Sequence, residues 1–423
     1  MWDKISKIWK DQELRKRILF VLGLLVIFRF AAHIPIPGID AENLKRFFSS
    51  NQLLGLMSVF SGGSLSQFSI ISLGVGPYIT ASIIFQLLAM IIPKLEAMNK
   101  EEGGRQKINQ YTRLLTVPLA LLQAYSMITL LSRSGQQIIL NLSAFNVVAM
   151  IITMTAGTIF MMWLGELISE KKVGNGVSLL IFAGIVDRIP SIIQQVALTY
   201  DRAQVINLVA FSVIALLTIA GVVAMNEAKR NVPISYAKRV RGMKMYGGAE
   251  THLPLRVNIA GVIPIIFAIS IILFPPMIAQ FFTGAKSAWI ANAANFVIVA
   301  FGNQLFYGIL YFAMVVAFTY FYTSVIFHPT QIAENLQKNG GFVPGIRPGA
   351  HTADYLKYVT NRIIFAGALF LGVLAILPLL LQQFTGLESL VIGGTSLLIV
   401  VSVVIETVKQ IESQMLAREY EKY

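Results

Sequence analysis

Residues 69–86 read SIISLGVGPYITASIIFQ and contain no charged side chain. Gly74, Gly76 and Pro77 stand near the beginning of this stretch. Glycine tolerates backbone conformations that other residues avoid, and proline is accepted in the first turn of a helix. We therefore expect an irregular entry into an apolar helix of about 20 residues, the length that crosses the hydrocarbon core of a bilayer.

Similar apolar runs recur along the whole chain of 423 residues. Apolar residues make up 56% of the sequence and charged residues only 13%, so much of the apolar surface must face lipid. The predicted membrane spans are 18–34, 71–92, 114–132, 146–165, 176–197, 206–226, 258–281, 304–327, 361–381 and 389–411.

The basic residues indicate how these spans are oriented. Of the 34 lysines and arginines, 27 lie in alternate loops beginning with the N-terminal segment, and 6 lie in the other loops. Cytoplasmic loops carry the excess of basic residues in membrane proteins, so both termini are predicted to be cytoplasmic. A net charge of +13 is also typical of nucleic-acid binding, but its placement in loops between apolar runs favours a membrane protein.

Several function classes lack the residues that they need. The chain has no cysteine, and its four histidines are far apart, which excludes thiolate chemistry and disfavours a metal centre. The middles of the spans carry almost no acids, although ion-coupled pumps and intramembrane aspartyl proteases use them. The motifs HExxH, GxSxG and GxxxxGK[ST] are absent. A passive channel is favoured over a secondary transporter, an intramembrane enzyme and an insertase without a through-pore, and no cofactor is expected.

Segments outside the spans also have unusual compositions. Leu53–Phe68 reads LLGLMSVFSGGSLSQF and is too short and glycine-rich to span, so it is either an interfacial loop or, as we predict, re-entrant and covered by protein. The loops 227–257 and 328–360 are longer than helix connections need. Their Gly, Pro and aromatic residues suggest more than anchoring at the lipid surface. Residues 1–17 are amphipathic and are predicted to form an interfacial helix before a retained first span.

Five ordered motifs resemble the SecY family of protein-export channels. Beside residues 69–86, they are WLGELISEKKVGNGVSLLI at 163–181, YAKR at 236–239 with THLPL at 251–255, GFVPGIRPG at 341–349, and GGTS at 393–396. The resemblance extends from IPIPGID at 34–40 to the last span. The chain departs from the family at Lys172, where glycine is usual.

This resemblance implies an all-α membrane protein with ten transmembrane helices. They would form two pseudo-symmetric five-helix halves, residues 1–200 and 201–423, around a central hourglass pore with a re-entrant plug. A ring of bulky aliphatic side chains at the pore waist would exclude water and ions by dewetting. The matching positions here are Val75, Ile79, Ile181, Ile266 and Ile399.

The resemblance also implies a plug and a lateral gate. The plug would lie near residues 53–68, and this chain has Gln67 where the family often has a basic residue, so packing would have to hold the plug. The matching plug positions are Leu56, Met57, Val59, Phe60, Gly62 and Gly63. The polar contacts of the lateral gate would involve Thr80, Gln123 and Asn258.

The two long inner loops resemble the docking site of a cytosolic partner, either the SecA ATPase or a translating ribosome. The implied docking residues are Lys238, Arg239, Arg241 and Arg347. The expected function is a non-enzymatic channel that passes unfolded preproteins outward and releases signal sequences and other hydrophobic segments into membrane lipids. The implied partner subunits are SecE and SecG, and the implied location is the bacterial inner membrane.

Overall fold

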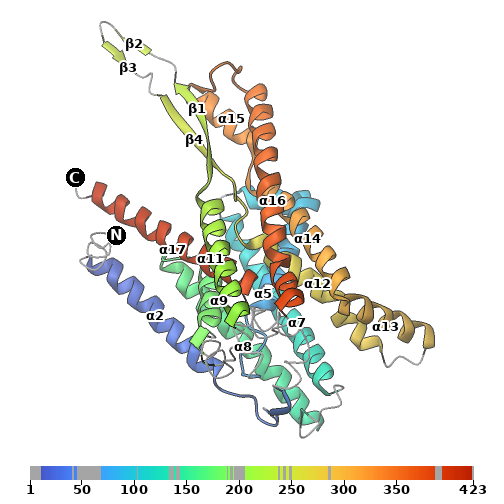
Figure 1. The fold of residues 1–423 in the computed structure, drawn as a ribbon. Coiled ribbons are helices and arrows are strands. Elements are labelled where there is room, and N and C mark those ends of the chain that lie inside the picture. Colours follow the sequence, from blue (N-terminus) through green and yellow to red (C-terminus); the bar gives the residue numbers. More distant parts are fainter. Residues whose placement is uncertain are drawn as a thin grey trace. The chain divides into compact units, whose positions relative to one another are not determined.

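The computed structural model describes residues 11–40, 42–44, 68–101, 103–132, 138–139, 143–187, 189–190, 194, 205–236, 239–241, 244–246, 250–283, 287–385 and 393–421. Most of them are helical (Figure 1). The helices are α2 (Gln12–Ala32), α5 (Gly76–Ile91), α6 (Pro93–Lys100), α7 (Gly104–Ser132), α8 (Ala144–Glu170), α9 (Gly176–Val186), α11 (Val205–Glu227), α12 (Ile263–Phe282), α13 (Ala288–Gly302), α14 (Gln304–Ile326), α15 (Pro329–Lys338), α16 (Ala350–Thr385) and α17 (Gly393–Glu421).

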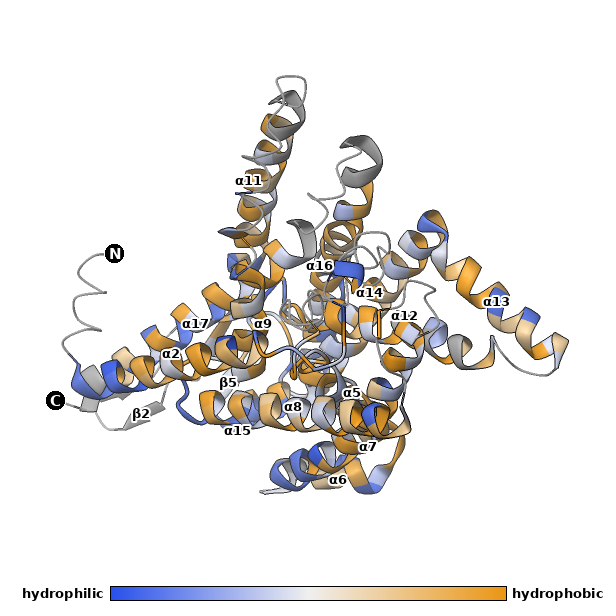
Figure 2. Ribbon diagram, turned by 90° about the horizontal axis from the view of Figure 1, so that it is seen from below, coloured by the Kyte–Doolittle hydropathy of each residue, from blue (hydrophilic) through white to orange (hydrophobic). Residues whose placement is uncertain are grey.

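Each predicted membrane span overlaps one of these helices. Figure 2 shows the hydrophobic residues that cover most of them. Among the described residues, four helical stretches are long and apolar enough to cross a membrane: Gln106–Ser132, Ala144–Glu170, Gln304–Lys338 and Ala350–Leu380. Shorter apolar helices are Gly76–Ile91, Gly176–Val186, Ser212–Glu227, Ile263–Pro276 and Ala288–Gly302.

The segments between spans contain more regular structure than predicted. The connection between the spans 258–281 and 304–327 holds α13, an apolar helix of 15 residues that is too short to satisfy a span criterion. The predicted inter-span segment 328–360 contains α15, a short strand and the beginning of α16. The apolar side chains of α15 and α16, such as Ile332 and Leu356, pack against the strands, and a search for long apolar runs does not detect helices of this kind.

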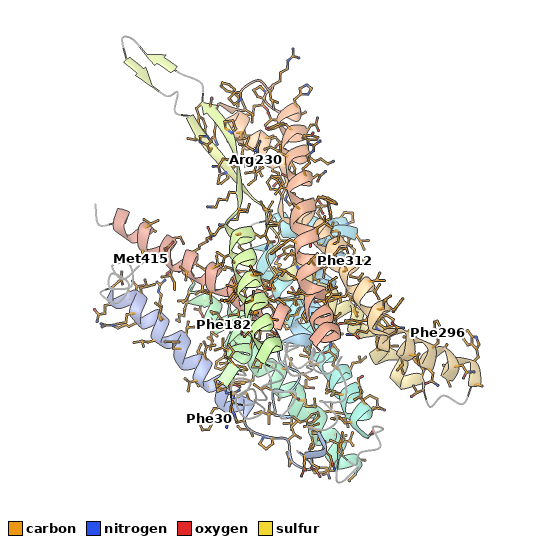
Figure 3. All side chains as sticks on the ribbon, in the orientation of Figure 1. Phe30, Phe182, Arg230, Phe296, Phe312 and Met415 are labelled. Atoms are coloured by element: carbon orange, nitrogen blue, oxygen red, sulfur yellow. The ribbon has the colours of Figure 1, made fainter. Side chains whose placement is uncertain are left out.

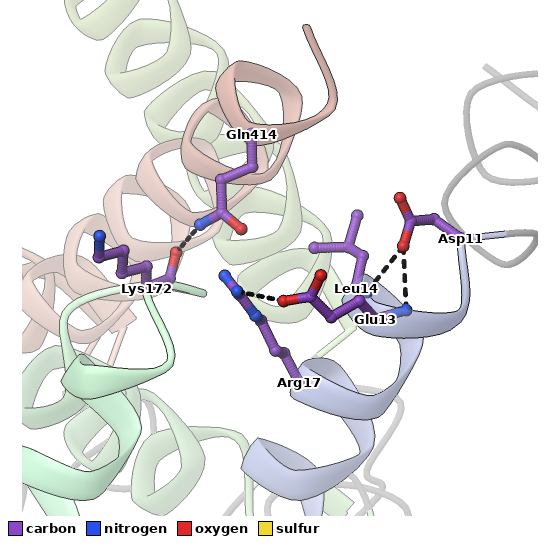
Figure 4. A network of polar contacts seen from close by, with 6 residues as sticks. All are labelled: Asp11, Glu13, Leu14, Arg17, Lys172 and Gln414. Atoms are coloured by element: carbon purple, nitrogen blue, oxygen red, sulfur yellow. Dashed lines mark hydrogen bonds and ion pairs between the residues drawn. The ribbon is translucent and has the colours of Figure 1, made fainter. Parts of the chain in front are cut away.

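The first described helix, α2, begins at a strong side-chain cap. The Asp11 carboxylate accepts hydrogen bonds from the backbone N–H groups of Glu13 and Leu14, each at 3.0 Å (Figure 4). This satisfies donors that a helix N-terminus leaves without partners. Arg17 pairs with Glu13 one turn earlier at 2.5 Å, a spacing that places the two side chains on one face.

The chain divides into two compact units, which are described separately. The first unit comprises Met1–Val209, Ser270–Tyr307 and Ile399–Tyr423, and the second comprises Ala210–Ile269 and Gly308–Leu398. Helices α5, α7, α8 and α9 of the first unit pack successively on one another. The second unit contains α15, α16 and most of α11 and α14, together with the sheet.

An apolar cluster in the first unit holds the segment that precedes α5. The N–H of Ile36 donates to the carbonyl of Phe68, and the N–H of Ile70 donates to the carbonyl of Ile34, both at 3.0 Å. Phe68 is only 1% exposed. A Cβ added at Gly157 of α8 would lie 1.9 Å from the carbonyl oxygen of Ile70, so glycine permits direct contact of the two backbones.

The sheet of the second unit joins the two long inter-span segments. Strand β1 (Lys229–Tyr236) pairs antiparallel with β4 (Glu250–Arg256) and with β5 (Gly341–Phe342), giving the order β4-β1-β5. Strands β2 (Arg239–Arg241) and β3 (Lys244–Tyr246) form a separate two-stranded pair. Because β5 comes from the later segment, both segments belong to one folded body. We name it the docking platform after the role predicted for these segments, and it comprises β1, β4, β5, α15, residues 343–349 and the first turns of α16.

Candidate functional site

The entry into α5 is irregular, as the sequence predicts. Residues 70–75 form consecutive turns, with Gly74 at φ +58°, a left-handed conformation that favours glycine. Pro77 stands in the first turn of α5, where its missing N–H has no helical acceptor in any case. The predicted ring residues Val75 and Ile79 are one turn apart, joined by the bond from the Ile79 N–H to the Val75 carbonyl at 3.0 Å. They are 1% and 8% exposed.

The turn between α8 and α9 positions a further ring residue, Ile181. The Ser169 hydroxyl donates to the Gly165 carbonyl at 2.8 Å and accepts from the Gly176 N–H at 2.9 Å. A Cβ on Gly176 would lie 1.8 Å from the Gly165 oxygen, so only glycine fits. Asn175 caps α9 by accepting from the Ser178 N–H at 3.2 Å.

Lys172 occupies the position at which the chain departs from the family pattern. Its φ is +59°, a left-handed conformation that costs a non-glycine residue about 1–2 kcal/mol. The turn therefore keeps the geometry that glycine would favour, with lysine in its place. The Gln414 side-chain amide of α17 donates to the Lys172 carbonyl (Figure 4), which ties the turn to the last helix.

The remaining ring positions lie on α17 and α12. Ile399 on α17 belongs to the first unit with Val75, Ile79 and Ile181, and it is 2% exposed. Ile266 on α12 is half-buried and belongs to the second unit. Four of the five positions are therefore buried in one unit, and the ring itself stays a prediction.

An apolar cavity of about 660 Å³ lies beside α5 within the first unit. Its α5 wall is a single helical stripe, since Thr80, Ile83, Ile84 and Leu87 are three or four residues apart. The other walls come from α12 and α13, and Thr80 and Ser270 are the lining residues with polar side chains. The remaining lining residues are Ile271, Phe274, Pro275, Ile278, Ala279, Phe282, Ile290, Ala293, Ala294 and Val297. We name this cavity the lateral pocket.

The predicted gate residues make local polar contacts. The Thr80 hydroxyl donates to the Gly76 carbonyl of its own helix at 3.0 Å. Gln123 on α7 faces the beginning of α5, because its Oε1 lies 3.9 Å from the position of a Cβ on Gly76. In the second unit, the Asn258 side-chain amide donates to the Asn226 Oδ1 at 2.8 Å. Thr80 and Asn258 thus bond inside their own units, and their role in a gate stays a prediction.

The predicted plug residues Leu56, Met57, Val59, Phe60, Gly62 and Gly63 lie outside the described residues. The described end of the predicted segment is Phe68, which is buried in the cluster of the first unit. The plug assignment therefore stays a prediction. Phe68, at the C-terminal end of the predicted segment, is well packed.

The docking platform has a compact apolar core and an exposed arginine. Val232, Leu255, Val343 and Leu356 form the buried core, which joins β1, β4 and α16. The exposed Arg347 follows Gly345 at φ +80° and precedes Gly349 at φ +95°.

Two hydrogen bonds to backbone carbonyls hold the turn that contains Arg347. The Ile346 N–H donates to the Val343 carbonyl at 3.0 Å, and the Thr352 hydroxyl donates to the Arg347 carbonyl at 2.9 Å. The exposed charge is therefore held on an ordered turn. Of the other predicted docking residues, Arg239 and Arg241 lie in β2, where the structure describes their backbone and not their side chains. Lys238 lies outside the described residues.

Two ion pairs join helices of the first unit. Arg29 near the end of α2 pairs with Asp187 at the end of α9. Arg113 on α7 pairs with Glu166 on α8, with Nε and Oε1 2.5 Å apart. In the sequence, opposite charges at the ends of apolar runs are a signal for ion pairs. Only the packing of the helices shows which charges pair with each other. Among the described residues, no group of three or more His, Cys, Asp or Glu side chains is arranged to hold a metal ion.

Comparison with known proteins places these features in a family. Residues 69–408 match the sequence profile of SecY. The protein translocase subunit SecY of Streptomyces galbus is 44% identical over 441 aligned residues, which cover 100% of both chains.

Solved structures show the same fold. A SecY channel in which the plug domain stabilises the closed state matches with a TM-score of 0.62 and 18% identity, covering 93% of this chain and 91% of that one. Sec61 in a canine ribosome–channel complex from the endoplasmic reticulum matches with a TM-score of 0.62 and 17% identity, covering 94% and 91%. The profile match and the full-length identity to SecY together show that this chain belongs to the SecY family.

Proposed function

We propose that this chain is the pore-forming subunit of a bacterial protein translocase. It passes unfolded polypeptides across the inner membrane and releases hydrophobic segments sideways into the bilayer. The relatives are named as translocase subunits, and the similar solved structures are protein-conducting channels. The chain acts as a passive conduit, and a partner motor or the ribosome drives transport.

The observation that carries this proposal is the double role of α5. Val75 and Ile79 at its beginning are buried and supply the proposed pore ring. Residues from Thr80 onward on the same helix line the lateral pocket. Helix α5 thus separates a central path for polar polypeptide from the lateral pocket, which is almost wholly apolar. An apolar signal segment gains by leaving water for such a site, and hydrocarbon offers it an equally favourable environment.

The lateral pocket predicts where a signal sequence binds, and the chain suits a direct test because it has no cysteine of its own. Cysteine introduced at Ile84, on the pocket wall, should form a disulfide with a cysteine in the hydrophobic part of a stalled signal sequence. The matched control is Ile152→Cys on α8, a position that is 59% exposed and outside the pocket. Equal cross-linking at both positions, or none at Ile84 while export proceeds, would refute the pocket as the lateral exit.

The docking platform supports a cytosolic partner that presents negative charge. Arg347 stands exposed on an ordered turn, and a guanidinium binds carboxylate or phosphate through two parallel hydrogen bonds. SecA and the ribosome both offer such groups, and a similar solved structure is a ribosome–channel complex. SecE and SecG are the proposed partner subunits, and both termini are proposed to be cytoplasmic because of the basic inner loops.

The docking proposal is tested by Arg347→Glu in vesicles that contain the chain with its partner subunits. Lys357→Glu is the matched control, since Lys357 is also exposed on the platform but lies on α16. Loss of SecA-dependent preprotein export in the Arg347 variant alone is expected. Unchanged export in that variant, or the same loss in both variants, would remove Arg347 as the docking residue.

A further inference from the structure

Helix α13, Ala288–Gly302, carries no charged residue. Its 15 residues extend about 22 Å at 1.5 Å per residue, which is less than the roughly 30 Å of a hydrocarbon core. It connects α12 with α14, two proposed spans, so that both of its ends are held at the level of one membrane surface. An apolar helix that is tied to the membrane but cannot cross it must have another covering environment.

Two faces of α13 have different surroundings. Ile290, Ala293, Ala294 and Val297 are three or four residues apart, form one stripe, and line the lateral pocket. Another stripe contains Trp289, Phe296 and Val299, which are 80%, 74% and 72% exposed. Figure 3 labels Phe296 on this helix.

The exposed face of α13 also carries two asparagines, both exposed. Asn292 is three residues from Trp289 and four from Phe296, so it lies within the same stripe. Asn295 lies beside that stripe. Around the helix, Val299 falls between the two asparagines, and Trp289 with Phe296 forms the apolar part of the face.

Apolar side chains are also exposed at the neighbouring helix ends, where Phe282 of α12 is 47% exposed and Leu305 of α14 is 70% exposed. A helix with exposed aromatic residues, one of them a tryptophan, and uncharged asparagines beside them has the character of a membrane interface.

We propose that α13 lies along the boundary of the hydrocarbon core, with Trp289 and Phe296 among lipid acyl chains and Asn295 toward the headgroups. Lipid is favoured as the covering partner because α13 is joined at both ends to proposed spans. The lateral pocket then has one wall that is itself embedded in lipid. A hydrophobic segment that moves out of the pocket past α13 enters hydrocarbon without crossing water.

The lipid contact can be measured by spin labelling of single cysteines, because the chain has none of its own. Nitroxides at Trp289→Cys and Phe296→Cys, in vesicles with the partner subunits present, should collide several-fold more often with oxygen, which concentrates in lipid, than with a water-soluble nickel chelate. Leu216→Cys on α11, 67% exposed, is the lipid reference, and Lys357→Cys is the water reference. Asn295→Cys should fall between them.

Two results would overturn the proposal. Nickel accessibility at Phe296 equal to that at Lys357 would place the stripe in water. Exclusion of both reagents from Trp289 and Phe296 would show that a protein partner covers them.

The side of the membrane rests on the orientation proposed above and is tested separately. A membrane-impermeant maleimide added to intact spheroplasts should label Asn295→Cys from outside. Labelling only after the membrane is opened would refute the proposed orientation and leave the lipid contact standing.

Discussion

Gly176→Ala should loosen the junction between α8 and α9. The new Cβ would lie 1.8 Å from the carbonyl oxygen of Gly165 and 2.8 Å from the hydroxyl of Ser169. Real Cβ contacts below 3.0 Å are essentially never seen, so α9 would have to move away from α8 by about 1.2 Å. Both close atoms are held, the first by the backbone of α8 and the second by its hydrogen bonds. The junction therefore has no side chain that can simply rotate away.

The size of the effect follows from two losses. Overpacking of a close contact costs about 1–3 kcal/mol, and loss of the hydrogen bond from the Gly176 N–H to Ser169 costs about 0.5–1.5 kcal/mol. A total loss of about 1.5–4.5 kcal/mol in local stability is expected. Because each 1.36 kcal/mol corresponds to about tenfold in rate, the half-life of the native complex at a fixed elevated temperature should fall by at least about tenfold. A half-life is the proper quantity because large membrane proteins unfold irreversibly.

Gly174→Ala is the matched control in the same turn. A Cβ at that position meets the side-chain atoms Leu179 Cδ1 at 2.9 Å and Thr407 Oγ1 at 3.0 Å, and both side chains can rotate. Its cost should stay below about 1 kcal/mol. A Gly176 variant as long-lived as the parent protein, or two variants with equal losses, would refute the argument from backbone contact.

Three further outcomes are expected. Lys172→Gly should lengthen the same half-life, because relief of the left-handed lysine, worth about 1–2 kcal/mol, exceeds the entropic cost of glycine, about 0.5–1 kcal/mol; a shorter half-life would contradict this. Joint replacement of Ile79 and Ile399 by serine should let ions leak through resting vesicles, and a tight seal in a conductance measurement would refute the pore ring. Leu356→Ala, at a fully buried position, should destabilise the docking platform by about 2–5 kcal/mol and increase its cleavage in limited proteolysis, whereas Lys357→Ala should not.

The positions of the membrane helices could be predicted from the sequence. Every predicted span overlaps a helix, and residues 69–86 contain both the irregular turns and the beginning of α5. The bilayer imposes this regularity, because an apolar segment in lipid must satisfy its backbone hydrogen bonds internally. Helix α13 and the helices of the docking platform were missed, because short segments carry too weak a signal for a search based on span length.

The candidate site was only partly accessible to sequence reasoning. The motif resemblance singled out Gly176 and Arg347, which the structure places in a backbone contact and on an exposed, ordered turn. It did not indicate that Arg113 pairs with Glu166, or that β5 joins β1. These contacts connect residues that are tens of residues apart in the chain, and each depends on which helices and strands become neighbours.

The sequence by itself determined the ten apolar runs, the basic bias of alternate loops and the family, since each is a property of local composition or of ordered motifs. Only the tertiary structure decided that the residues of α5, α12 and α13 enclose one apolar cavity, and that both long inter-span segments fold into a single platform. Composition determines whether a segment prefers lipid or water. Which apolar stripe meets another depends on close packing between distant helices, where a single glycine, such as Gly157 or Gly176, sets how near two backbones can come.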